Sequence, residues 1–115
     1  MNSKPEISLL YDFYGELLNS AQQQVVELYV NEDLSLSEVA EILRISRQGV
    51  RDSLARAERK LNGYEEKLGL LQAYRDRRER RNAVCGLIGQ IKNTEGCDRI
   101  LPQLDKIEEL MRGDD

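Results

Sequence analysis

The side chains with the clearest chemical potential lie close together between residues 46 and 59. Those that can hydrogen-bond to bases or phosphates are Ser46, Arg47, Gln48, Arg51, Asp52, Arg56 and Arg59. Gln can pair bidentately with adenine, and Arg can pair with guanine or with a phosphate. A Ser that caps a helix also places backbone N–H groups where a phosphate can accept from them. This set favours a helix that contacts nucleic acid.

Helical spacing divides these residues between faces of the predicted helix. If Val50, Leu54 and Ala57 face inward, the outward positions are Gln48, Asp52, Ala55 and Arg59, with Arg47 and Arg51 on one flank and Arg56 on the other. Asp52 can accept from N4 of cytosine, or it can repel phosphates. The alternative interpretation is that all of these are solvated surface positions, and the residues alone leave both open.

The residues that would position this helix have the pattern of a helix-turn-helix. Its predicted packing residues are Val39, Ala40, Leu43, Ile45, Val50 and Leu54. A small residue is needed where the two helices cross, and Ala40 meets that need. We expect Ile45, in the turn, to fill the gap between the helices. Ser35 with Glu38 forms a capping-box pattern for the first helix, and Ser46 caps the second.

One position departs from the usual helix-turn-helix pattern. The turn commonly has Gly where this chain has Arg44, because that position often needs a positive φ. A residue other than Gly can hold that conformation at a cost of about 1–2 kcal/mol. Arg44 therefore fits the helix-turn-helix pattern only if the chain keeps a left-handed conformation there.

Charge is concentrated in the middle of the chain. Residues 44–81 carry twelve Lys and Arg against six Asp and Glu, although the whole chain has a net charge of −4. Five Arg fall between residues 75 and 81. A basic middle between acidic flanks localises any polyanion contact to the middle. The alternative is a solvated helix face that keeps the protein soluble.

The composition argues against several classes of function. The chain has no His, which removes His-based acid–base chemistry, and it has no Gly-rich phosphate loop. The two isolated cysteines, Cys85 and Cys97, are expected to be reduced thiols and not zinc ligands. No apolar run is long enough to span a membrane. We expect a cytoplasmic protein that is not an enzyme, with no cofactor, metal or membrane partner.

The sequence pattern predicts an all-α fold. Helices are expected at about 6–18 and at about 20–30, the second capped by Ser20 with Gln23. A short helix from about 36 to 43 and a long helix from 47 follow, with a possible bend near Asn62 and Gly63. Two amphipathic segments, 83–91 and 100–111, predict a C-terminal helical hairpin. The predicted organisation is a helix-turn-helix domain over 1–61, a helical extension over 62–81 and the hairpin over 82–115.

Apolar residues continue along the long helix beyond the helix-turn-helix. They follow a 3.5-residue period through Leu61, Tyr64, Leu68 and Leu71. Something must cover these side chains: the first helix, the hairpin, or the same surface of a second chain. We expect a homodimer with these four residues at its interface.

Two resemblances are carried by specific motifs. Residues 20–61 resemble region 4 of bacterial sigma factors, through residues 35–40, 45–47, 50–51 and 54–57. Residues 7–81 are more specifically similar to the YlxM family of small bacterial proteins. The residues that carry this similarity are Leu10-Tyr11-Asp12-Phe13-Tyr14, Tyr29, Ser46-Arg47-Gln48-Gly49-Val50 and Tyr64-Glu65-Glu66-Lys67-Leu68.

The YlxM resemblance implies a DNA-binding regulatory protein tied to the signal recognition particle pathway. DNA is then the expected partner. One alternative is binding to the RNA of the signal recognition particle through the same basic face, where shape and phosphate contacts dominate. A second alternative is a protein–protein module that binds the targeting GTPase.

Overall fold

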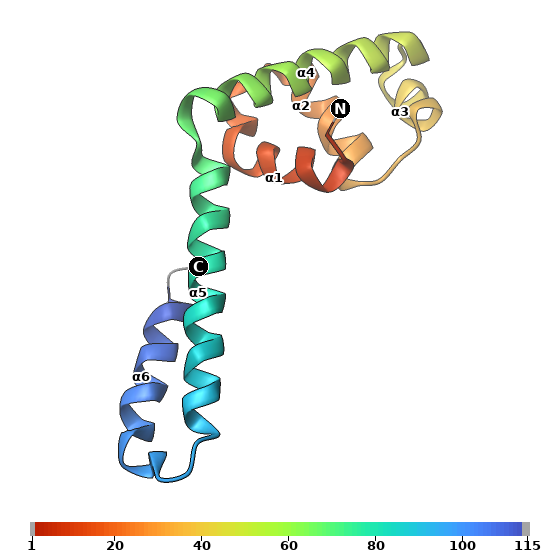
Figure 1. The fold of residues 1–115 in the computed structure, drawn as a ribbon. Coiled ribbons are helices and arrows are strands. Elements are labelled where there is room, and N and C mark those ends of the chain that lie inside the picture. Colours follow the sequence, from red (N-terminus) through yellow and green to blue (C-terminus); the bar gives the residue numbers. More distant parts are fainter. Residues whose placement is uncertain (1, 114–115) are drawn as a thin grey trace. The chain divides into compact units, whose positions relative to one another are not determined.

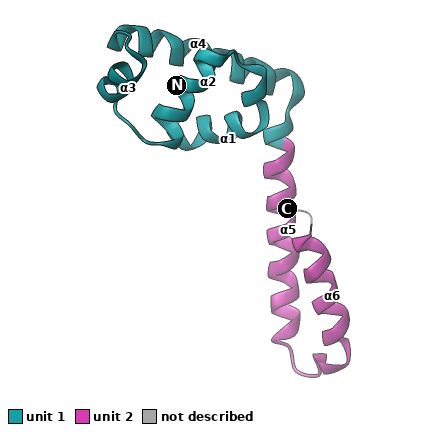
Figure 2. Cartoon of the chain, turned by 180° about the vertical axis from the view of Figure 1, so that it is seen from behind, with its two compact units in different colours: residues 1–72 teal, residues 73–115 magenta. Residues whose placement is uncertain are grey.

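The structure is a computed structural model that describes residues 2–113, and these residues form helices and connecting turns without a β-strand (Figure 1). The all-α prediction is confirmed. The helices are α1 (Lys4–Tyr14), α2 (Ser20–Val26), α3 (Leu36–Leu43), α4 (Arg47–Leu68), α5 (Leu70–Lys92) and α6 (Leu101–Arg112). The chain divides into two compact units, Met1–Gln72 and Ala73–Asp115 (Figure 2), so the expected extension over 62–81 falls partly in each.

The first two helices begin at residues other than those expected. α1 starts at Lys4, because the Ser3 side chain accepts from the backbone N–H of Glu6. The Ser20–Gln23 capping box is wrong by one residue: Asn19 has the extended backbone of an N-cap and forms a reciprocal capping box with Gln22. Asn is as good an N-cap as Ser, so the pattern alone did not decide between them. α1 ends in a 3₁₀ turn, Gly15–Leu17, and a π-helical turn, Glu27–Asn31, follows α2.

The core of unit 1 forms where α2, α3 and α4 meet. Val25, Val39, Ala40 and Val50 make one buried cluster. Partly buried apolar side chains surround it: Leu28, Tyr29, Leu34, Leu36, Leu43 and Leu54. Figure 1 shows α4 running along the other helices of this unit. α4 therefore both completes the core and presents its opposite side to solvent.

α4 is unbroken at Gly63 and ends five residues later, at Leu68. Gly69 has φ +64°, and its N–H donates to the carbonyl of Glu65, which closes the last turn. The predicted bend near Asn62 and Gly63 is wrong, since a single exposed-side Gly costs a helix only about 1 kcal/mol. The continuous apolar period through Leu71 therefore spans two helices.

A polar cluster holds the junction between α4 and α5. The Glu65 carboxylate accepts from the backbone N–H groups of Leu71 and Gln72, and from the Tyr14 hydroxyl at 2.6 Å. The same hydroxyl oxygen accepts from the N–H of Leu70 at 3.0 Å. Burial, and then the hydrogen bond to Glu65, raise the pKa of Tyr14 above its ordinary value, so the phenol stays a donor.

This arrangement corrects the predicted dimer interface. Leu61 is 0% exposed, and α1 and α2 pack against the helix that carries it. Leu71, in α5, is also buried. The Tyr64 ring lies 6.0 Å from the Tyr14 ring, and its hydroxyl donates to the Leu17 carbonyl. Leu68 alone of the four predicted interface residues is largely exposed, at 58%. Helices of the same chain thus cover Leu61 and contact Tyr64.

Unit 2 contains the expected helical hairpin, but the first helix of that hairpin, α5, begins at Leu70 and not near residue 83. α5 and α6 are joined through a turn at 93–96 and a 3₁₀ turn, Cys97–Ile100. Lys92, at the end of α5, pairs with Asp105 at 2.6 Å and with Glu108 at 2.5 Å, both on α6. Ile88 and Leu104 are buried between the helices.

We predict that Ala40→Leu lowers the free energy of unfolding by about 1–3 kcal/mol, because Ala40 lies in the buried cluster and a larger side chain overpacks it. Chemical unfolding followed by circular dichroism measures the change. The matched control is Ala83→Leu, at an exposed position of α5. Equal stability of the two variants would contradict close packing at Ala40.

Candidate nucleic-acid interface

The turn between α3 and α4 is set by backbone conformation and one cap. Arg44 is left-handed, with φ 57° and ψ 43°, as expected for the position where Gly is usual. The N–H of Ile45 then donates to the Ala40 carbonyl at 3.1 Å. Ser46 caps α4, and its hydroxyl accepts from the N–H of Gly49 at 2.9 Å. α3, the turn and α4 thus have helix-turn-helix geometry.

The predicted packing residues divide into three groups. Val39, Ala40 and Val50 are buried, and Leu43 and Leu54 are partly buried against them. Ile45 is 44% exposed, so the prediction that it fills the gap between the helices is wrong. It lies instead over Gly49, where a Cβ would come within 3.7 Å of Ile45 Cδ1 and 3.2 Å of Ser46 Oγ. The sequence analysis missed this close approach at Gly49.

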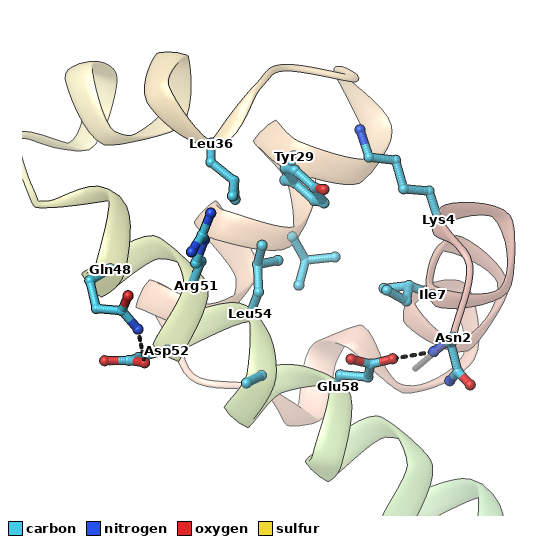
Figure 3. A pocket seen from close by; sticks show the side chains of 12 residues that line it. Asn2, Lys4, Ile7, Tyr29, Leu36, Gln48, Arg51, Asp52, Leu54 and Glu58 are labelled. Carbon is cyan, nitrogen blue, oxygen red and sulfur yellow. Dashed lines mark hydrogen bonds between the residues drawn. The ribbon is translucent and has the colours of Figure 1, made fainter.

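The outward face of α4 carries a preformed pair of polar side chains. Gln48 and Asp52 are exposed, and Gln48 Nε2 donates to Asp52 Oδ1 at 3.0 Å (Figure 3). Arg59 is exposed on the same strip, where its Nε donates to the Ala55 carbonyl at 3.4 Å. Ala55, between them, has no bulky side chain to keep a ligand away. The strip therefore offers amide, carboxylate and guanidinium groups over about three turns.

Cationic side chains border this strip on both sides. At 100° per residue, Arg47 and Arg51 fall on one flank of α4, and Arg56 and Lys60 fall on the other. Arg47, Arg51, Arg56 and Lys60 are all exposed. Lys60, which the sequence analysis did not single out, is held by a hydrogen bond from its Nζ to Gln22 Oε1 at 3.3 Å. Asn19, Gln22, Arg56, Arg59 and Lys60 line one shallow depression.

A second depression, of about 430 Å³, lies beside α4 on the Arg51 flank (Figure 3). Its apolar walls include Ile7, Tyr29 and Leu54. Lys4 lies over the Tyr29 ring, 4.1 Å from its centre, and pairs with Asp33 at 2.9 Å. The buried Glu58 carboxylate accepts from the backbone N–H of Asn2 at 2.5 Å. The N-terminal residues are thereby held against the helix that carries the candidate interface.

Residues 2–113 also bear on the metal-binding and membrane-spanning classes that the sequence argued against. No group of three or more His, Cys, Asp or Glu side chains there could hold a metal ion. Within the same range, no helix combines the length and apolarity required to cross a membrane. Cys85 and Cys97 are free thiols.

Comparison with known families supports the helix-turn-helix geometry. Residues 1–97 match the model of UPF0122, the family of helix-turn-helix proteins described as YlxM / p13 like. The chain belongs to this family.

Relatives at substantial identity come from several bacteria. UPF0122 protein YlxM of Bacillus subtilis is 38% identical over 102 residues, which cover 89% of this chain and 93% of that protein. A UPF0122 protein of Thermoanaerobacter sp. is 42% identical over 101 residues, covering 88% and 86%. One of Caldanaerobacter subterraneus is 54% identical over 70 residues, covering 61% of this chain but only 60% of that relative's length.

We predict that Ser46→Ala lowers the free energy of unfolding by about 1 kcal/mol, because the N–H of Gly49 loses its acceptor. Ser46→Asn is expected to retain most of the stability, since Asn caps equally well. Urea unfolding of both variants checks this, with the exposed Ser37→Ala as the control. If Ser46→Ala and Ser37→Ala have the same effect, the cap does not stabilise α4.

Proposed function

We propose that this protein is a non-enzymatic, DNA-binding regulator that places residues 47–60 of α4 in the major groove. The observation that carries the proposal is the polar strip of Gln48, Asp52 and Arg59, bordered on both flanks by exposed cations. Membership of a helix-turn-helix family supports the same conclusion.

The dimensions of α4 agree with those of B-DNA. Arg51 and Lys60 are nine residues apart, which is about 13 Å along a helix. The major groove is about 12 Å wide and has phosphates on both sides. Cations at these two positions can therefore contact phosphates on opposite sides of the groove while Gln48 and Asp52 face base edges. In this division of roles, the flanks fix position and the strip reads sequence.

The Gln48–Asp52 hydrogen bond gives a role to Asp52, a carboxylate within a surface that is proposed to bind a polyanion. A hydrogen bond from a neutral amide does not cancel the repulsion between the Asp52 carboxylate and phosphates, but it does place the Gln48 side chain against Asp52 Oδ1. The acid thus orients Gln48 and leaves the Gln48 carbonyl oxygen able to accept from a base amino group. This arrangement favours base recognition over a merely solvated surface.

DNA is favoured over RNA because of groove shape. The major groove of A-form RNA is too deep and narrow for side chains to read, and a helix such as α4 fits the major groove of B-DNA. The resemblance to the YlxM family adds a biological setting: we propose that regulation by this protein is linked to the signal recognition particle pathway. Binding to the particle's RNA or to its GTPase is a distinct outcome of the test below.

We predict that binding to a random-sequence duplex weakens with salt, so that log affinity falls linearly with log salt concentration. Arg47→Ala, Arg51→Ala and Arg56→Ala are each expected to reduce the magnitude of that slope by about 1. Fluorescence anisotropy at several salt concentrations gives the slopes. Gln48→Ala is expected to leave the slope unchanged and to alter which sequences a random pool yields on selection.

Lys67→Ala and Lys106→Ala are the controls, because both residues are exposed but lie outside the interface. Equal effects at control and interface positions would show that α4 is not the binding surface. If the protein binds the particle RNA or the targeting GTPase more tightly than any selected duplex, then that molecule, and not DNA, is its partner.

A further inference from the structure

Unit 2 leaves a wide apolar surface uncovered. On α5, Leu87 and Ile91 are exposed, and on the α6 side Ile100, Ile107 and Leu110 are exposed. Their exposed fractions run from 41% for Ile91 to 64% for Leu110. We refer to these five residues as the hairpin face. Most large apolar side chains of a stable domain are buried, so this exposure needs an explanation.

Four of the five residues, Leu87, Ile91, Ile107 and Leu110, lie on the same side of the hairpin, and Ile100 lies in the 3₁₀ turn just before α6. At 100° per residue, Leu87 and Ile91 are rotated about 100° and 60° from the buried Ile88, in one sense around α5. Ile107 and Leu110 are rotated about 60° and 120° from the buried Leu104, in the same sense around α6. The helices are antiparallel and side by side, as Figure 2 and the Lys92–Asp105 pair show. Equal rotations on antiparallel neighbours point to one side, so the hairpin face is continuous.

We propose that the hairpin face is a homodimer interface, in which two hairpins pack into a four-helix bundle. Two helices alone can bury only one narrow seam, here marked by Ile88 and Leu104. Units of about 40 residues are too small to stabilise themselves without disulfides, metals or association. Among residues 2–113 there is neither a disulfide nor a metal-binding cluster, and association is the means that remains.

The area agrees with a second copy as the occupant. The hairpin face presents on the order of 500 Å² of apolar surface, which is at the upper end of what monomers expose. Two such faces would together bury on the order of 1,000 Å², where specific interfaces begin. A face that is aliphatic throughout, with Leu and Ile on both helices, can pack against itself across a two-fold axis. The four-helix bundle is the usual result of pairing two antiparallel hairpins.

This interface differs from the seam along α4 considered from the sequence. There Leu61 is buried within the chain, whereas Leu68 remains exposed to the same 58% as Leu87. Leu68 and Leu87, which are equally exposed, therefore form a matched pair for experiment. The inference does not depend on nucleic-acid binding.

Sedimentation equilibrium of the full chain, at about 5–100 µM, tests the proposal. The wild type is expected to have twice its 13.2 kDa monomer mass at the upper concentrations. Leu87→Glu with Ile107→Glu should give monomer throughout. Leu87→Ala with Ile107→Ala should raise the dimer dissociation constant at least about tenfold while circular dichroism shows unchanged helix content, because Ala favours helix.

Leu68→Glu is the control and is expected to dimerise as the wild type does. A monomeric wild type would overturn the proposal. Dimers that survive both double substitutions, or that dissociate with Leu68→Glu, would equally overturn it. These readouts differ from duplex binding, so failure here is distinguishable from failure of the proposed function.

Discussion

The close packing of α3 against α4 at Ala40 is the constraint on which the rest of unit 1 depends. Because Ala40 is small, α4 approaches closely enough for Val50 to join Val25 and Val39 in one cluster. That contact fixes the rotation of α4 about its axis. Once the rotation is fixed, Gln48 and Asp52 must face outward, and the cations must fall on the two flanks. The candidate interface is thus a consequence of core packing as much as of surface chemistry.

The second determinant is the way α4 ends. Gly69 supplies the left-handed residue, and the Glu65 carboxylate takes up N–H groups at the start of α5 that would otherwise lack acceptors. Tyr14, from α1, donates to the same carboxylate and so ties the first helix to this junction. Two residues at the end of α4 and one from α1 therefore define where the helix-turn-helix unit stops.

Local signals predicted much of this structure correctly. The Ser35–Glu38 capping box and the Ser46 cap rest on interactions within a few residues, which a sequence displays directly, and two amphipathic segments indicated the hairpin. The failures involve contacts across the chain. Leu61 could be interpreted as a dimer residue because the apolar spacing predicts that its side chain is buried but does not indicate which helix buries it. The Tyr14–Glu65 hydrogen bond, across 51 positions, leaves no sequence pattern. At the candidate site, residue types and faces were predictable, but the Lys60–Gln22 contact and the approach of Ile45 to Gly49 were not.

The hydrogen bond between Gln48 and Asp52 has a consequence for the entropy of recognition. Long polar side chains on a free helix occupy several rotamers, and a ligand that orders them opposes its own binding. Here two such side chains, one turn apart, restrict each other before any ligand arrives. Less rotamer freedom is then lost on contact, so discrimination between base pairs depends more on hydrogen-bond geometry than on the cost of ordering the side chains. Asp52 weakens the attraction of this cationic surface to phosphate, but by restricting Gln48 it can increase the selectivity between base pairs.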